Sequence, residues 1–217
     1  MTQDNSYFKR AADAVAALES CSGDVETAAA AIAKAAEGGR LVHVFGLDAC
    51  SADIEGEIFF RAGGLACVDP LYDPAFSNSH GGYRSELCRV LDGLAPRVLD
   101  YYERIEPGDP LLLLALDENS LAFAQAAGWS REHGLTTIAV IPERPLDGAT
   151  NGNIDLAVCF GRGGGLESVR MTAVLGAVAE RAVRLAPKAD VWTGDIFPDP
   201  EKDRETIDKY LWRVRHL

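Results

Sequence analysis

Short apolar runs alternate along this chain with segments of helical periodicity. The runs are rich in Leu, Val and Ile and lie at 41–45, 65–68, 111–116, 136–141 and 154–160. Helical segments follow at 51–62, 83–104 (with a break near Gly93 and Pro96), 120–133 and 166–186. Parallel strands need crossover connections of this kind, and they are apolar throughout because both faces of the sheet are covered. The alternation predicts an α/β fold, a doubly wound parallel sheet of five strands.

Helical extensions are expected at both ends. Residues 6–19 carry an apolar stripe at helical spacing, and the Ala-rich segment 24–37 ends at Gly38-Gly39, a helix-stop signal. A last helix starts at Asp199-Pro200-Glu201. Between the second run and the next helix, the stretch 69–82 is rich in Pro, Asn, Ser and Gly and is typical of a long functional or mobile loop.

The charge and cysteine composition indicates which binding partners and which cellular location are expected. The 33 acidic and 21 basic side chains give a net charge of −12, which repels nucleic acid and anionic membranes, so neither is an expected partner. Five cysteines without a Cys-x-x-Cys pair indicate reduced thiols. No apolar run approaches the roughly 20 residues that span a bilayer, and the start, 1–5, does not resemble a signal peptide. A cytoplasmic protein is expected.

Two strand-to-helix turns locate the candidate ligand site. One follows the run 41–45 and the other follows the run 111–116, and both should meet at the carboxyl edge of the sheet, where backbone N–H groups face a small anionic ligand. The candidate ligand-binding residues in these turns are Asp48, Cys50, Ser51, Asp117, Asn119 and Ser120. Carboxylates stand here where a phosphate site would have hydroxyls and glycines.

Several stretches resemble the sugar isomerase (SIS) domain, and most closely the small bacterial SIS proteins related to phosphoheptose isomerase. The stretches are 42–46, 59–65 (Phe-Phe-Arg-Ala-Gly-Gly-Leu, the most specific), 105–109 and 209–217. The resemblance implies a flavodoxin-like three-layer αβα fold and a homo-oligomer, dimer or tetramer. It implies a single SIS domain over 1–217, with an N-terminal helical pair at 1–40, an α/β core at 41–186 and a C-terminal loop and helix at 187–217.

The resemblance also implies a function. The ligand would be a sugar or sugar phosphate, and the reaction would be aldose–ketose isomerisation. By position, Ser51 matches the serine of the first phosphate turn, and Thr172 keeps a hydroxyl on the long helix. Glu57 keeps an acid after the first turn. Isomerisation needs a base and an acid beside a carbonyl, and Glu57 with His80, on the loop 69–82, are the catalytic candidates. Neither a cofactor nor a metal is expected.

The second turn departs from the family pattern. The Ser-x-Ser-Gly positions are occupied by Ala115, Leu116, Asp117 and Glu118. An ionised Asp about 4 Å from a phosphate adds roughly 4 kcal/mol of repulsion at an effective dielectric of 20, more than the about 0.3–2 kcal/mol that a helix dipole returns. Tight phosphate binding in the usual place is therefore not expected.

Three interpretations of Asp48, Asp117 and Glu118 stay open. The carboxylates cap the helix starts in place of a phosphate, or they meet an amino sugar or a polyol, or they offer oxygen ligands to a divalent metal. Two functions follow: a phosphosugar-binding protein and isomerase with a degenerate phosphate site, or a catalytically silent SIS subunit or scaffold. His43, inside a strand, is expected to be a core histidine, and the loop 161–165 a flexible connector with Arg162 as its only cation.

Overall fold

The computed structural model describes residues 6–194 and 198–217. Five strands form one parallel sheet in the order β2-β1-β3-β4-β5. Their bounds are β1 Val42–Gly46, β2 Val68–Pro70, β3 Pro110–Leu114, β4 Thr136–Ile141 and β5 Leu156–Cys159. The predicted parallel α/β fold is confirmed. The start of the chain at 1–5 lies outside the described residues.

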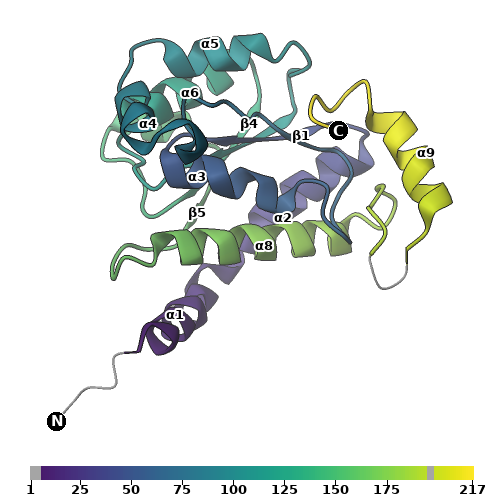
Figure 1. Ribbon diagram of the computed structural model, residues 1–217, viewed down its shortest axis with the longest axis horizontal. Helices are drawn as coiled ribbons and strands as arrows, with labels where there is room; N and C mark the ends of the chain where they lie inside the picture. Colours follow the sequence, from purple (N-terminus) through teal and green to yellow (C-terminus); the bar gives the residue numbers. More distant parts are fainter. Residues whose placement is uncertain (1–5, 195–197) are drawn as a thin grey trace.

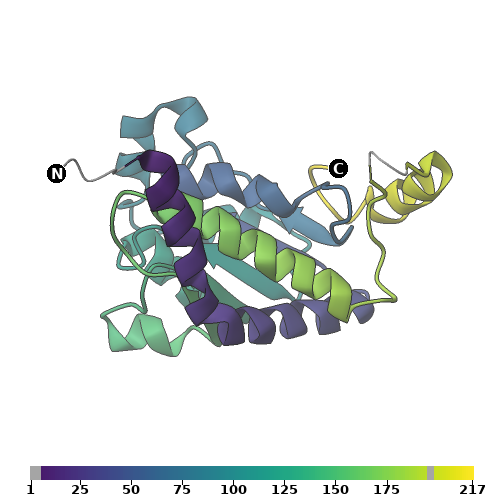
Figure 2. The ribbon, with the colours of Figure 1, turned by 90° about the horizontal axis from the view of Figure 1, so that it is seen from below.

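Helices cover both faces of the sheet (Figure 1). The side chains of β3 show why, because Leu112 and Leu114 join one apolar core while Leu111 and Leu113 join the other. Helices α2 (Ser22–Glu37) and α8 (Glu167–Leu185) pack on the first face and on each other, as Figure 2 shows from below. Helices α5 (Leu94–Tyr101) and α6 (Leu121–Glu132) pack on the second. The result is the expected three-layer αβα arrangement.

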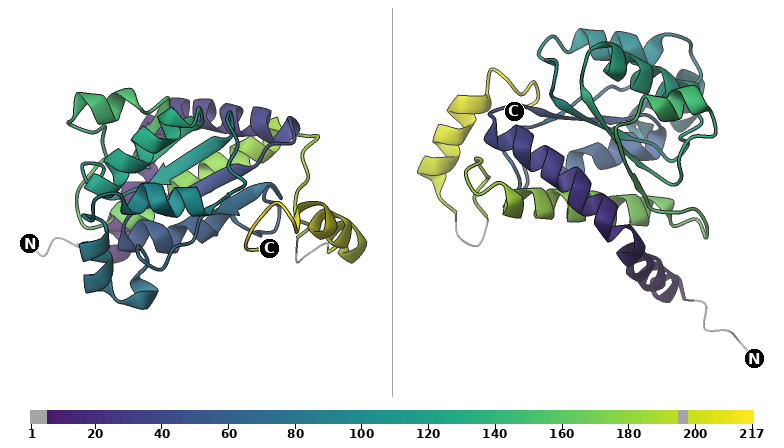
Figure 3. Two further views of the ribbon diagram at one scale, coloured as in Figure 1. Left: turned by 90° about the horizontal axis from the view of Figure 1, so that it is seen from above. Right: turned by 180° about the vertical axis from the view of Figure 1, so that it is seen from behind.

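The remaining elements are short or peripheral. They are α1 Tyr7–Ala16, α3 Ala49–Ile54, α4 Gly82–Cys88, α7 Gly148–Gly152 and α9 Pro200–Tyr210, with 3₁₀ turns η1 Ala17–Cys21, η2 Glu55–Ile58 and η3 Asn78–His80. Helix α9 stands beside the sheet, outside the two helical layers (Figure 3). Helix α1 extends from the body and leaves Phe8 83% exposed.

Several parts of the chain differ from the predictions. The helix expected over 51–62 ends at Ile54 and continues as a 3₁₀ turn to Ile58. The strand expected over 65–68 is displaced to 68–70, and Leu65 instead forms one antiparallel bridge with Val191. The stretch 142–153, for which the sequence pattern predicts no helix, contains α7, because the Asp147 carboxylate accepts hydrogen bonds from the N–H groups of Ala149 and Thr150 and so starts a helical turn.

A close backbone approach ties β1 to α3. A Cβ at Gly46 would lie 2.4 Å from the backbone of Ala52, so only glycine fits at this position. The contact brings the first turn of α3 directly onto the carboxyl end of β1. The position of the candidate site therefore depends on this glycine.

At the opposite end of the sheet, His43 is a buried core histidine, as predicted. Its Nδ1 lies 3.0 Å from Asp69 and its Nε2 lies 3.3 Å from Asp109, which also contacts Arg40. Burial lowers the pKa of His43, but the hydrogen bonds and charges of Asp109 and Asp69 outweigh it and hold that pKa above its ordinary value. The cluster therefore favours an imidazolium between two carboxylates.

The His43→Asn variant should unfold more easily, because two buried carboxylates then lose their shared cation. We expect a loss of about 3 kcal/mol in unfolding free energy near pH 6. The folded-state pKa lies above the unfolded one, so this stabilisation is complete below the unfolded pKa and fades as the pH rises through the folded pKa. Urea unfolding near pH 6 and about pH 9 measures it; an equal loss at both pH values would contradict the charged pairing.

Candidate functional site

The carboxylate of Asp48 joins the ends of β1 and β3. Its Oδ1 accepts hydrogen bonds from the N–H groups of Cys50 (3.1 Å) and Ser51 (3.0 Å) at the start of α3. Its Oδ2 accepts from the N–H of Leu116, just after β3, at 2.6 Å. Asp48 is buried, and it stands where the N–H groups of two adjacent strand ends would surround a bound anion.

The hydroxyl of Ser51 is also used inside this turn. Ser51 is fully buried, and its Oγ accepts from the N–H groups of Leu47 and Asp48, both at 3.0 Å. Together with Asp48 it forms a capping box, in which each side chain bonds the backbone of the other residue. The sequence predicts Ser51 as a ligand-binding residue, but the structure commits its hydroxyl to the fold.

The second turn is closed by ion pairs. Asp117 lies 2.5 Å from Arg89, and its other oxygen accepts from the N–H of Asn119 at 3.3 Å. The cap of α6 is Ser120, whose Oγ accepts from the N–H of Phe123. Of the interpretations left open for Asp117, a cap on α6 is not what the structure shows, because Ser120 stands directly before the first helical residue and is the cap.

Glu118 is buried and bound by an arginine from a distant loop. Both carboxylate oxygens lie 2.5 Å from Nη2 of Arg162, whose Nη1 also donates to the carbonyl of Leu116 at 3.3 Å. Asn119 contributes from within the turn, since its Nδ2 donates to Glu118 and its Oδ1 accepts from the N–H of Leu146. The loop 161–165, expected as a flexible connector, therefore also has a structural role, because its one cation, Arg162, neutralises Glu118.

Cys50 and Thr172 lie where α3 meets α8. The Cys50 thiol is half-buried, and α3 contacts α8, the helix that contains Thr172. Burial raises the pKa of Cys50, and the charges of Asp48 and Asp53 raise it further. The thiol is therefore not activated as a nucleophile. Thr172 is half-buried at this helix contact.

An open pocket of about 540 Å³ lies beside this turn, between α3 and the residues that follow β2. It is lined by Ala52, Asp53, Glu55, Tyr72, Asp73, Pro74, Ser77, Ser79, His80 and His216. Ser77 holds the loop 69–82 against α3, since its hydroxyl donates to Asp53 at 2.9 Å. The lining contains three acids and two histidines but no lysine or arginine.

The buried acid of this pocket is Glu55, whereas the sequence predicts Glu57. Glu55 is 1% exposed and its Oε2 accepts from the N–H of Gly46 at 2.7 Å, while Glu57 is exposed and does not line the pocket. Burial raises the pKa of Glu55 well above its ordinary value, although the Gly46 hydrogen bond opposes the shift. The signal in the sequence was the four-residue spacing from Ser51, which places both residues on one buried helical face.

Two histidines face the pocket, one predicted and one missed. His80 is exposed at the end of η3, and His216 reaches the pocket from the C-terminal tail. The Tyr102 hydroxyl donates to the carbonyl of Tyr72 at 2.7 Å, so the Nε2–H of His216 donates to the Tyr102 oxygen at 3.1 Å. Burial lowers the pKa of His216, which leaves its Nδ1 as an acceptor at neutral pH.

Within residues 6–194 and 198–217, no group of His, Cys, Asp and Glu side chains has the arrangement of a metal site. The candidate oxygen ligands have separate partners: Asp48 contacts backbone N–H groups, Asp117 contacts Arg89 and Glu118 contacts Arg162. None of the described helices combines the length and the apolar character needed to cross a membrane.

A family model, the SIS domain, matches residues 6–141. The chain therefore belongs to the SIS domain family. UPF0309 proteins of Brucella ovis and Brucella abortus are 34% identical to it over 116 residues, 54% of this chain and 47% of theirs. The chain spans about half the length of these curated relatives.

Solved structures with this fold include phosphoheptose isomerases from Francisella tularensis and Neisseria gonorrhoeae. Their TM-scores to this chain are 0.55 and 0.56, at 14% and 12% sequence identity. The superposition covers 85% and 83% of this chain and 96% and 95% of theirs. At these identities the likeness establishes the shared fold.

Replacing Asp48 should cost much more stability than replacing Asp117. Asp48→Ala leaves three backbone N–H groups without their acceptor and should lower the unfolding free energy by about 2 kcal/mol. Asp117→Ala removes a half-exposed ion pair and should cost less than about 1 kcal/mol. Urea unfolding of both variants tests the assignment, and equal losses would show that Asp48 is not the residue that organises the turn.

Proposed function

We propose that this protein binds a carbohydrate derivative in the pocket beside Glu55 and acts on it as a sugar isomerase. The observation that carries the proposal is the buried carboxyl of Glu55, which lines an open pocket together with two histidines. Membership of the SIS family and the fold shared with phosphoheptose isomerases support a sugar as the ligand. The five free thiols fit the cytoplasmic location that we propose with it.

The ligand we propose is a neutral or amino sugar, because the usual phosphate position is filled. The N–H groups of Cys50, Ser51 and Leu116 already donate to Asp48, so a phosphate there would have to displace a carboxylate that is part of the fold. The pocket itself offers Asp53, Glu55 and Asp73 without an opposing cation. Such walls favour hydroxyl and ammonium groups and repel a dianion.

The chemistry available in the pocket is proton transfer. Aldose–ketose isomerisation moves a proton from the carbon beside a carbonyl to the carbonyl carbon, while the hydroxyl proton on that neighbouring carbon passes to the carbonyl oxygen, and both transfers need groups that accept and donate. Glu55, whose pKa burial raises well above its ordinary value, suits an acid–base role. The neutral Nδ1 of His216 and the exposed ring of His80 are the partners that we propose for it, in place of Glu57.

A binding and exchange experiment tests this function. Wild-type protein should be stabilised by amino sugars or polyols in a thermal-shift panel and should exchange the C2 proton of a bound aldose with D₂O, followed by NMR. Glu55→Gln keeps an acceptor for the Gly46 N–H but loses the titrating group, so exchange should fall at least about a hundredfold. Glu57→Gln, two residues away and outside the pocket, is the matched control and should behave as wild type.

Two outcomes would contradict the proposal. If Glu57→Gln abolishes exchange while Glu55→Gln does not, the acid has been misassigned. If no sugar stabilises the wild-type protein and no exchange occurs, the pocket is not an isomerase site.

One observation supports a second function, that of a silent SIS subunit or scaffold. On α1, Tyr7 is 52%, Phe8 83% and Val15 42% exposed, which leaves an apolar stripe without a partner in the described chain. A second copy of the chain is the partner that we propose. Phe8→Asp should then reduce the oligomer mass in sedimentation experiments, while a wild-type monomer would remove the support for this second function.

A further inference from the structure

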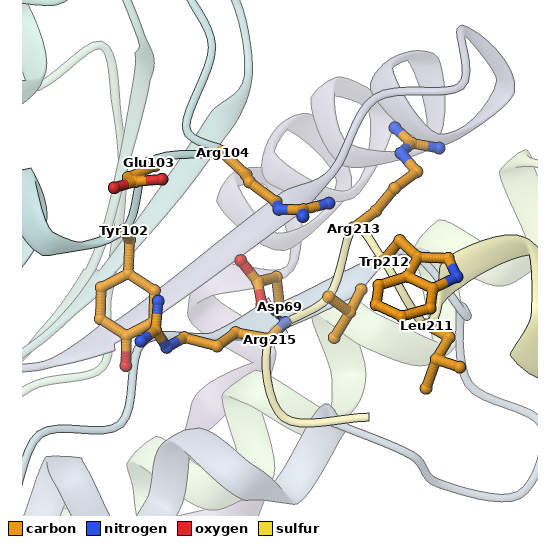
Figure 4. Close-up of a pocket in the computed structure, with 9 residues that line it drawn as sticks. Asp69, Tyr102, Glu103, Arg104, Leu211, Trp212, Arg213 and Arg215 are labelled. Carbon is orange, nitrogen blue, oxygen red and sulfur yellow. Dashed lines mark hydrogen bonds between the residues drawn. The ribbon is translucent and has the colours of Figure 1, made fainter.

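A separate hollow of about 260 Å³ lies between the segment 102–104 and the C-terminal tail, away from the pocket of Glu55. Three arginines line it: Arg104, Arg213 and Arg215. Figure 4 shows Arg104 extending toward the segment that contains Arg213, with the ring of Trp212 on the other side of that segment's Arg213 side chain. In a chain with a net charge of −12, this convergence of cations is unusual.

The arginines differ in how far the fold already uses them. Arg213 donates to the carbonyl of Gly39 at 2.6 Å, and the guanidinium of Arg215 lies 4.0 Å over the ring of Tyr101. Arg104 is exposed and has neither an ion pair nor a hydrogen bond to any residue of 6–194 or 198–217. Its charge is therefore available to a ligand.

Among the described residues, the acids around the hollow form no ion pair with Arg104 or Arg213. Asp69 forms part of the floor but is only 2% exposed, and its two oxygens are bound by the ring of His43 and the N–H of Arg215. The carboxylate of Glu103 points away from Arg104 and Arg213 (Figure 4). Glu106 lines an adjoining hollow that shares Arg104 and Arg213.

The wall beside the arginines is apolar and open to solvent. Trp212 is 73% and Leu211 40% exposed, and both line the hollow. Guanidinium groups bind phosphate oxygens in bidentate fashion, and an exposed indole offers a surface for stacking. Two or three guanidiniums suit a dianion with oxygens in several directions better than a single planar carboxylate.

We propose that this hollow is a binding site for a small phosphate ester with a ring or apolar portion, with Arg104 and Arg213 on the phosphate and Trp212 against the organic part. The site lies near the amino ends of β1 and β3, since the adjoining hollow is lined by Arg40 and Asp109. It does not rest on the function proposed above, which uses a different pocket, although Tyr102 lines this hollow and hydrogen-bonds His216 of that pocket.

The test compares three probes on the full chain. Phenyl phosphate carries both features, inorganic phosphate only the dianion, and benzoate a ring with a carboxylate. Binding is measured by calorimetry and by the fluorescence of Trp212, with Trp212→Phe used to assign the signal. We expect phenyl phosphate to bind more tightly than phosphate and benzoate to bind most weakly, with affinities that fall as the ionic strength rises.

Arg104→Gln supplies the decisive comparison because the fold does not use this side chain. It should weaken phenyl phosphate binding at least about tenfold, the effect of one lost charge-assisted hydrogen bond. Arg97→Gln, an exposed arginine on α5 outside the hollow, is the matched control and should bind as wild type. Glu55→Gln should not change this affinity either.

Two results would overturn the proposal. One is a wild-type protein that shows no saturable binding of phenyl phosphate. The other is an Arg104→Gln variant that binds it as tightly as wild type, which would place the ligand elsewhere on the chain.

Discussion

Three backbone N–H groups at the junction of β1, α3 and β3 need an acceptor, and the carboxylate of Asp48 supplies it. A buried donor without a partner costs about 1–3 kcal/mol, so this junction has to contain an anion or a side chain that replaces one. Here the replacement is the Asp48 side chain, which is part of the chain itself and is therefore always present. In the turn after β1, the Ser51 hydroxyl accepts hydrogen bonds from its own turn's backbone, and in the turn after β3, Arg162 pairs with Glu118. Both arrangements fit a strand-end site that is closed to phosphate.

The two ends of the sheet consequently differ in character. At the carboxyl ends the open pocket contains acids and histidines, whereas near the amino ends a buried histidine holds two carboxylates beneath a hollow lined by arginines. The C-terminal tail reaches both. Arg213 and Arg215 line the hollow and His216 lines the pocket, while Val214, between the two arginines, is 1% exposed and anchors the tail in the core.

The sequence predicts the sheet well because buried parallel strands leave a direct signal. The runs that became β3 and β4 are apolar on both faces, and a short run of that kind between helical segments is typical of a strand covered on both sides. The carboxylate cap at Asp48 is also predictable from local sequence, since an Asp just before a helix can accept hydrogen bonds from the first N–H groups of that helix. The change from α-helix to 3₁₀ turn at Glu55 has no such signal, although the four-residue spacing from Ser51 does favour Glu55 as the buried glutamate.

Contacts between distant segments account for what the sequence missed. Glu118 and Arg162 are 44 positions apart, and His216 meets Tyr102 across 114 positions. Local periodicity carries no information about either pair. Asp117 shows the opposite case, because a local cap was plausible there but Ser120 lies closer to the helix start and takes the role.

The amide resonances of Cys50, Ser51 and Leu116 test the central claim most directly. In ¹⁵N-labelled protein titrated with millimolar sugar phosphate, these three resonances should not move in a saturable way, because Asp48 already accepts their hydrogen bonds. Saturable shifts confined to these amides would show that phosphate displaces Asp48 and would contradict the account.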